Sequence, residues 1–309
     1  MAAPRAAGRR LPWPRVPERV RRAVETTLGA AIVEARTQEG GFSPGAAARL
    51  RLANGGRAFV KALGVDVQEL GTGLYRAEAV AMAHLPAGLP APRLLDVYDD
   101  GEWVALVFED VDGRHPAIPW KPDELERVAA ALADLGAALT PSPWPEAPAA
   151  PDANRAFVAA WRELAAAPPA DLDPWLGRQL ARLAAEGPDL AGLVAGDTLL
   201  HGDVRSDNLL LTPDGGVVLL DWAWTCNGAG WLDVVWFAET VNAEGGADAD
   251  RLVRDHPLTR AVPAPWIDAA VLAAAAIRWR MSRQPAAPPH HRAYAEANLR
   301  WARRRIGPS

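Results

Sequence analysis

The sequence predicts an α+β fold in which a small antiparallel sheet lobe is followed by a larger, mainly helical lobe. From about residue 37 to residue 110, apolar segments alternate with turn signals, as in β-hairpins. Farther along the chain, apolar residues recur at the spacing of amphipathic helices. A single connector over residues 110–124 separates the two patterns, and no repeat of about 20–50 residues is visible. We therefore expect two lobes that share one chain.

Two hairpins and one helix account for the expected sheet lobe. Turn signals at residues 54–56 (Asn-Gly-Gly) and 99–101 (Asp-Asp-Gly) each lie between two strand-like segments. The helix between the hairpins ends before Pro86, which cannot continue it. The expected strands cover residues 46–53, 57–63, 93–98 and 102–110, and the expected helix covers residues 68–85.

The rest of the chain reads as a series of helices joined by Pro-rich loops. The expected helices cover residues 123–139, 153–167, 173–186, 230–242, 264–281 and 291–305. From these boundaries we expect an N-terminal helical extension at residues 1–36. The sheet lobe then occupies residues 37–111, and the helical lobe occupies residues 112–309.

Composition and charge exclude several classes of protein. The 309 residues carry a formal net charge of −5, so no basic surface for nucleic acid is expected. Cys226 is the single cysteine, which excludes an intrachain disulfide and a cysteine-based zinc site. Arg and Pro interrupt residues 1–22, unlike a signal peptide, and the apolar stretch 269–279 is too short to span a bilayer. We expect a cytoplasmic protein without nucleic-acid or membrane partners.

Oxygen-bearing side chains gather in the segment 199–222. Asp203 and Asn208 lie on a loop before a short strand, and Asp221 ends the strand that follows a Pro-Asp-Gly-Gly turn. All three side chains are therefore expected to converge at the mouth of one hairpin. Phosphoryl transfer needs such a set, because a carboxylate orients and deprotonates a hydroxyl while other oxygens bind Mg²⁺. The alternative is that they serve only as turn residues, which Asp and Asn favour.

The same segment carries a recognisable motif. H-G-D-x-x-x-x-N, here at residues 201–208, is followed by a strand that ends in Asp-Trp at residues 221–222. This pattern resembles the aminoglycoside phosphotransferase family, which has a protein-kinase-like two-lobed fold. The resemblance covers about residues 39–239, and the residues beyond match only in being helical.

The resemblance implies that Asp203 is the catalytic base and that Asn208 and Asp221 hold Mg²⁺. The family usually has His-Pro-Gly or a similar sequence before the Asn, whereas this chain has Arg-Ser-Asp. Two roles therefore stay open for Arg205, which either contacts the transferred phosphate or pairs with Asp207.

Two further residues are expected to support this loop. The resemblance implies that His201 holds the loop rather than transferring a proton. It also implies that Asp233, within the helical segment G-W-L-D-V-V-W-F, braces the loop without reacting.

Residues 39–63 resemble the nucleotide-binding hairpin of the family. Lys61 lies on the second strand of this hairpin, and Glu78 follows it by 17 residues on the next helix. The resemblance implies that the lysine holds the nucleotide phosphates and that Glu78 holds the lysine, although Glu69 is a nearby competitor. The expected phosphate-binding turn contains Gly40, Gly41, Ser43 and Gly45, whose backbone amides approach phosphate oxygens.

Residues 106–113 resemble the hinge between the lobes, where backbone groups of Phe108, Glu109 and Val111 are expected to bind the adenine edge. The expected cofactors are ATP, with GTP left open, and Mg²⁺. The function that follows is transfer of the γ-phosphoryl group to a hydroxyl of a small molecule. Acceptors compatible with the resemblance are an aminoglycoside-like antibiotic, a sugar or an amino-alcohol metabolite.

Two other functions stay open. A catalytically silent nucleotide-binding regulator would keep Lys61 and the hinge but lack the base or a metal ligand. A metal-dependent hydrolase would use His201, Asp203 and Asp207, but the other histidines fall in no ligand-like spacing. Both are less favoured than a kinase. The sequence does not indicate an oligomeric state.

Overall fold

The computed structural model describes residues 10–38, 40–41, 43–153, 155–284, 287 and 289–307. The described chain forms two compact units. The first, here called the sheet unit, contains the residues up to His115 and the segment Asp207–Trp224. The second, here called the helical unit, contains Pro116–Ser206 and the residues from Thr225 onward. The chain therefore passes between the units in the middle of the predicted motif.

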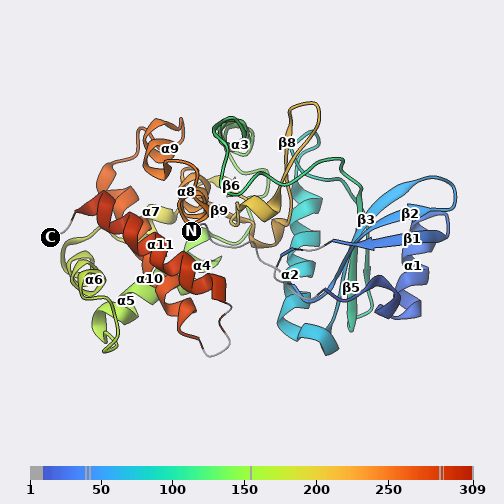
Figure 1. The fold of residues 1–309 in the computed structure, drawn as a ribbon, viewed down its shortest axis with the longest axis horizontal. Helices are drawn as coiled ribbons and strands as arrows, with labels where there is room; N and C mark the ends of the chain where they lie inside the picture. Colours follow the sequence, from blue (N-terminus) through green and yellow to red (C-terminus); the bar gives the residue numbers. More distant parts are fainter. Residues whose placement is uncertain are drawn as a thin grey trace. The chain divides into compact units, whose positions relative to one another are not determined.

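The sheet unit is built on an antiparallel sheet of five strands within the described residues, in the order β1-β2-β3-β5-β4 (Figure 1). The strands are β1 (Ile32–Thr37), β2 (Ala46–Leu52), β3 (Arg57–Gly64), β4 (Leu94–Asp99) and β5 (Trp103–Glu109). Both predicted hairpins are present, and the Asn54 side chain accepts a hydrogen bond from the Gly56 amide in the first turn. Strand β1 begins before residue 37, so it lies ahead of the region expected to contain strands.

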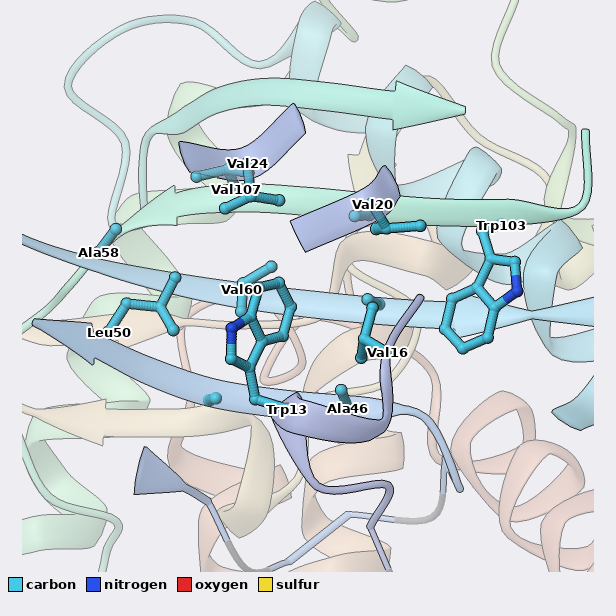
Figure 2. Packing of buried hydrophobic residues seen from close by; sticks show 13 residues of the cluster. Trp13, Val16, Val20, Val24, Ala46, Leu50, Ala58, Val60, Trp103 and Val107 are labelled. Atoms are coloured by element: carbon cyan, nitrogen blue, oxygen red, sulfur yellow. The ribbon is translucent and has the colours of Figure 1, made fainter. Parts of the chain in front are cut away.

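One face of the sheet is covered by the segment that precedes it. The short 3-10 helix η1 (Trp13–Arg15) and helix α1 (Glu18–Leu28) supply a row of buried side chains. Figure 2 shows this row lying on small and branched side chains of the strands. The cluster includes Trp13, Val16, Val20 and Val24 from this segment and Ala46, Leu50, Ala58, Val60, Trp103 and Val107 from the sheet. The N-terminal segment is thus part of the sheet core.

The opposite face of the sheet is covered by α2 (Val65–His84). Tyr75 of this helix packs with alternate residues of the strands, including Leu63 and Leu106. Because side chains alternate along a strand, β3 presents Val60 to the α1 face and Lys61 to the α2 face. The alternation therefore places the lysine beside α2.

The segment Asp207–Trp224 adds a second hairpin to the sheet unit. Strand β7 (Leu209–Leu211) pairs with β8 (Val217–Leu219), between the 3-10 helices η2 (Ser206–Asn208) and η3 (Trp222–Trp224). The Leu219 amide donates to the Pro90 carbonyl at 2.7 Å. This hydrogen bond attaches β8 to the sheet unit.

The helical unit is organised around α10 (Ala264–Ser282), whose Ala-rich surface lets neighbouring helices approach closely. Its other helices are α3 (Pro122–Ala138), α4 (Ala150–Ala153), α5 (Arg155–Ala166), α6 (Pro174–Glu186), α7 (Leu190–Val194), α8 (Leu232–Glu244), α9 (Ala249–Asp255) and α11 (Pro289–Ile306). A short antiparallel pair, β6 (Thr198–Leu200) and β9 (Cys226–Gly228), flanks the segment that contains the H-G-D-x-x-x-x-N motif. Asp173, Asp189 and Asp248 cap helix N-termini with their side chains.

The α+β prediction is confirmed, with the sheet and the helices in the expected chain order. In the described part of the chain, no helix has the length and apolar character needed to cross a bilayer. The expected boundaries at residues 36 and 111 stay predictions.

Candidate active site

The sheet unit holds a lysine between two carboxylates. Lys61 Nζ lies 2.6 Å from Glu78 Oε2 and 3.3 Å from Asp221 Oδ1. Glu78 is buried, with a side chain 2% exposed, whereas the side chains of Lys61 and Asp221 are 13% and 40% exposed. Lys61 therefore has one carboxylate partner inside the protein, Glu78, and one that is accessible to solvent, Asp221. Glu69, the competing partner, has no ion pair with Lys61 among the described residues.

The charges of this group are set by burial and by one another. Burial disfavours the charged form of Lys61, but the Asp221 and Glu78 carboxylates outweigh it and raise the lysine pKa above its ordinary value. Burial raises the pKa of Glu78 to about 7, although the Lys61 ammonium opposes this shift and the Trp222 amide donates to the carboxylate. Lys61 is thus a fixed cation.

Asp221 adopts an unusual backbone conformation. Its φ of 67° is the one positive value found for a non-glycine residue in the described part of the chain. The left-handed region costs an L-residue about 1–2 kcal/mol. Trp222, which follows it, is completely buried and anchors the turn against the protein. The strained residue carries the exposed carboxylate, as is common where a side chain must be aimed at a ligand.

Asn208 immediately precedes β7 and Asp221 closely follows β8, so both residues lie at the open end of the β7–β8 hairpin. The Leu220 amide donates to the Asn208 carbonyl at 2.8 Å, next to the register pair Leu209 and Leu219. The backbone therefore places an asparagine and an aspartate together at the open end of the hairpin. This set fits Mg²⁺, which takes one or two protein oxygens and fills its shell with phosphate and water. No cluster of three or more His, Cys, Asp or Glu side chains suited to a metal occurs among the described residues.

In the helical unit, Asp203 lies on a loop that is held through its backbone. The amides of His201 and Gly202 donate to the two Asp233 carboxylate oxygens at 2.8 and 2.9 Å. The Asp203 amide donates to Nδ1 of His201, which is completely buried, at 3.2 Å. Burial raises the pKa of Asp233, and the hydrogen bonds from the Gly202 and His201 amides oppose this rise. Asp203 itself keeps a side chain that is 23% exposed.

Arg205 faces Asp203 on the same loop. Its Nη1 lies 3.5 Å from Asp203 Oδ2, and the Arg205 side chain is 18% exposed. Ser206, the next residue, is buried and donates from its hydroxyl to the Glu244 carboxylate of α8. Trp120 Nε1 and the Tyr294 hydroxyl also donate to Glu244, at 2.7 and 3.1 Å. Of the residues that replace the usual family sequence, Arg205 thus contacts Asp203 and Ser206 is hydrogen-bonded to α8.

The predicted phosphate-binding turn is tied to a residue that sequence reasoning missed. Arg10 donates to the carbonyls of Gly40 and Ser43 at 3.0 and 2.8 Å, and the Ser43 hydroxyl lies 3.0 Å from the Tyr75 hydroxyl. At Gly45 a Cβ would lie 2.6 Å from the Ala62 carbonyl oxygen, so only glycine fits there. Gly40 and Gly41 have φ values of 111° and 73°, which glycine adopts readily.

The predicted hinge residues continue from β5. Phe108 is buried against the α2 face, and the Glu109 amide donates to the Arg93 carbonyl at 3.0 Å. Arg49 Nη2 donates to the Val111 carbonyl at 3.1 Å. These hydrogen bonds occupy the Glu109 amide and the Val111 carbonyl. Binding of adenine by the hinge residues stays a prediction.

The structure therefore brings the predicted residues together in two groups. Lys61, Glu78, Asn208 and Asp221 lie in the sheet unit, and His201, Asp203, Arg205 and Asp233 lie in the helical unit. Arg10 and Tyr75 were missed because neither stands in a recognisable motif. The signal that could have identified Tyr75 is its position on α2, where it faces the strand that carries Lys61.

Comparison with known proteins gives a family and a fold. The profile of the phosphotransferase enzyme family (APH) matches residues 71–266, more than half of the chain. No curated protein matches the sequence significantly.

Solved structures show what the fold resembles. Choline kinase LicA from Streptococcus pneumoniae aligns with a TM-score of 0.65 at 13% identity, covering 92% of this chain and 98% of that chain. A thermostable mutant of aminoglycoside phosphotransferase APH(4)-Ia, in a ternary complex with ADP and hygromycin B, gives 0.61 at 15% identity with coverages of 92% and 98%. An aminoglycoside phosphotransferase from Alicyclobacillus acidocaldarius gives 0.57 at 18% identity with coverages of 89% and 90%. These likenesses establish the protein-kinase-like fold.

Proposed function

The chain belongs to the phosphotransferase enzyme family and is a small-molecule kinase, and on this premise we propose that it transfers the γ-phosphoryl group of ATP to a hydroxyl of its acceptor. The observation that carries the proposal is Lys61, which lies 2.6 Å from Glu78 and 3.3 Å from Asp221. A buried cation fixed beside an accessible carboxylate suits a nucleotide phosphate bound with a metal ion. The nucleotide complex of a similar structure, with ADP, supports the same choice of cofactor.

In this proposal each group of residues has one task. Lys61 binds phosphate oxygens of the nucleotide, Glu78 keeps the ammonium in place, and Asn208 and Asp221 hold Mg²⁺. The metal ion supplies charge neutralisation of the phosphates. Catalysis consists mainly of positioning and electrostatic stabilisation, as expected for phosphoryl transfer.

Asp203 acts on the acceptor. Its carboxylate accepts a hydrogen bond from the acceptor hydroxyl and takes the proton as the acceptor oxygen bonds to the γ-phosphorus. The bond between that phosphorus and the oxygen bridging it to the β-phosphate breaks, and ADP leaves with the electron pair. Asp233 holds the loop through the His201 and Gly202 amides, so the carboxylate of Asp203 is positioned without itself being buried.

The test is Asp203→Asn, assayed by acceptor-dependent ADP release over a panel of hydroxylated small molecules. General-base catalysis contributes roughly a hundredfold to ten-thousandfold, so turnover falls by that range while Mg²⁺-ATP binding, measured by calorimetry, persists. Asp214→Asn, in the exposed β7–β8 turn, is the matched control and keeps wild-type turnover.

Two results would contradict the proposal. Wild-type protein that binds ATP but phosphorylates nothing in the panel behaves as a silent regulator. Asp203→Asn protein that keeps wild-type turnover removes Asp203 from the reaction.

A further inference from the structure

The carboxylate of Glu244 connects segments of the helical unit that are far apart in the sequence. Glu244 is the last residue of α8, which packs against α3 and α11 (Figure 1), and it is 3% exposed. Its Oε2 accepts from Trp120 Nε1 at 2.7 Å, and its Oε1 accepts from the Tyr294 hydroxyl at 3.1 Å and from the Ser206 hydroxyl. Trp120 precedes α3, Tyr294 lies on α11, and Ser206 ends the loop that carries Asp203. One buried carboxylate therefore joins this loop to the helices.

The surroundings of Glu244 are fixed by close packing. Trp120 is 2% exposed, and its ring lies edge-on to Phe237 of α8 with the ring centroids 5.2 Å apart. The Trp120 amide donates to the Gly245 carbonyl at 2.8 Å. A Cβ at Gly246 would lie 2.5 Å from the Trp120 carbonyl oxygen, so the two backbone segments are in direct contact. The carboxylate is thus an acceptor with a defined position.

The loop that carries Asp203 is held on both sides of this residue. Before Asp203, two consecutive backbone amides donate to the Asp233 carboxylate. After it, the Ser206 hydroxyl, in a residue that is 1% exposed, donates to Glu244. Both carboxylates belong to α8, Asp233 in its first turn and Glu244 at its end. A single helix therefore supports the loop at two points, and residues 203–205 lie between them.

We propose that Glu244 is a positioning residue for phosphoryl transfer, because through the Ser206 hydroxyl it fixes the loop from which Asp203 acts on the acceptor. This inference rests on the proposed function of the same loop. A hydrogen bond to a carboxylate is stronger than one between neutral groups, and burial removes the competition of water. Catalytic groups must lie within about 0.5 Å of their productive positions. Release of Ser206 therefore lowers turnover although every catalytic group is still present.

The main test compares two variants that each remove one hydroxyl from the same Glu244 oxygen. Ser206→Ala releases the loop, whereas Tyr294→Phe removes a hydrogen bond from α11 and leaves the loop attached. Each variant loses one hydrogen bond to a carboxylate, so we expect comparable losses of stability in thermal melts. Tyr294→Phe is therefore the matched control for destabilisation.

Turnover is measured with the full-length protein, Mg²⁺-ATP and the hydroxylated compound of the panel that gives the fastest ADP release. We expect Ser206→Ala to lower kcat by roughly tenfold to a hundredfold, while its KM for ATP changes less than about threefold. Tyr294→Phe keeps wild-type kcat. Calorimetric titration with Mg²⁺-ATP verifies that both variants are folded.

Hydrogen exchange gives a second readout that needs no acceptor. In protein without nucleotide, peptides that span residues 200–209 should exchange faster in Ser206→Ala than in wild type, because the loop has lost one of its two attachments. The same peptides should exchange at the wild-type rate in Tyr294→Phe.

A double-mutant cycle tests whether Glu244 and Ser206 act as one unit. Glu244→Leu removes the acceptor, so the addition of Ser206→Ala to it lowers kcat no further. If Glu244→Leu does not fold, the comparison of Ser206→Ala with Tyr294→Phe decides alone.

The outcomes separate this inference from the proposed function. Wild-type kcat in Ser206→Ala overturns the positioning role and leaves the kinase assignment intact. Equal losses of kcat in Ser206→Ala and Tyr294→Phe overturn it as well, because Glu244 then stabilises the unit without acting on the loop. Additive losses in the double variant contradict a shared action of Glu244 and Ser206. If wild-type protein binds ATP but phosphorylates nothing in the panel, the proposed function fails and this inference fails with it.

Discussion

Val60 and Lys61 are neighbours on β3, yet they lie on opposite faces of the sheet and in opposite environments. Val60 is completely buried beneath α1, in an entirely apolar cluster that includes Trp13 and Val24 (Figure 2). Lys61 faces α2, where it contacts Glu78 and Asp221. The α1 face thus stabilises the sheet, and the α2 face holds charges that serve the proposed reaction. Damage to one face should therefore leave the property supplied by the other largely intact.

The largest effect is expected from Lys61→Met on the α2 face. Loss of the ammonium removes the charge that binds the nucleotide phosphates, so kcat/KM falls by roughly a thousandfold. Steady-state kinetics with ATP measures this effect, and a thermal melt of the double variant Lys61→Met with Glu78→Gln, which avoids an unpaired buried carboxylate, shows little loss of stability. Lys121→Met, at the other lysine of the chain, is the matched control because Lys121 is exposed at the start of α3. If Lys61→Met kept a tenth of wild-type kcat/KM, the proposed role of the α2 face in the reaction would be contradicted.

The next effect is expected from Trp13→Ala on the α1 face. Trp13 is 4% exposed within the apolar cluster, and loss of a buried tryptophan costs about 3–5 kcal/mol of unfolding free energy. Chemical denaturation measures this loss, and kcat/KM at a temperature below unfolding stays close to wild type. A stable but inactive variant would show that the two faces are not separable.

Glu78→Gln sharpens the comparison through pH. The raised pKa of Glu78, about 7, means that the folded protein binds more protons than the unfolded chain between about pH 4.5 and pH 7. Stability contributed by this group is present below pH 4.5 and is lost as the pH rises through 7. In protein without nucleotide or magnesium, wild-type Tm should therefore fall relative to the Tm of Glu78→Gln over this interval. Parallel melting curves at every pH would contradict the prediction.

The same variant also tests the ion pair in catalysis. Gln keeps a polar contact to Lys61 but removes the charge, so kcat/KM falls by roughly a hundredfold. Glu69→Gln, on the same helix, is the matched control and keeps wild-type kcat/KM.

The smallest effect is expected from Arg10→Ala. The variant loses two hydrogen bonds to the Gly40 and Ser43 carbonyls, so the turn between β1 and β2 loosens. Each such bond contributes about 1 kcal/mol, so the loss of both raises the KM for ATP by up to about thirtyfold with kcat nearly unchanged. Tyr75→Phe, which loses only the contact to Ser43, should raise the KM less. An unchanged KM for ATP in Arg10→Ala would show that this turn does not contribute to nucleotide binding.

Patterns of local sequence account for the part of the molecule that was predictable. Turn signals between apolar segments predicted both hairpins of the sheet. The resemblance to the family pattern paired Lys61 with Glu78, and the structure places these two side chains 2.6 Å apart. Their roles, like those of Asp203, Asn208 and Asp221, stay predictions until they are tested.

The remainder depends on contacts between segments that are distant in the sequence. Glu244 stands in no motif, and only the packing of the helical unit brings Trp120, Ser206 and Tyr294 to its carboxylate. Arg10 reaches Gly40 across 30 residues for the same reason. Nothing in the local sequence indicates that the first helix covers a sheet face, because its amphipathic pattern does not identify the surface it packs on.

The strained turn at Asp221 has a consequence for anyone who engineers this protein. Glycine adopts its φ of 67° without steric cost, so Asp221→Gly should be a locally more comfortable choice for the backbone. Stabilisation by consensus or computational design that minimises backbone strain would select this substitution, and the carboxylate beside Lys61 would then be lost. Thermostable variants obtained without an activity screen should therefore be sequenced first at position 221.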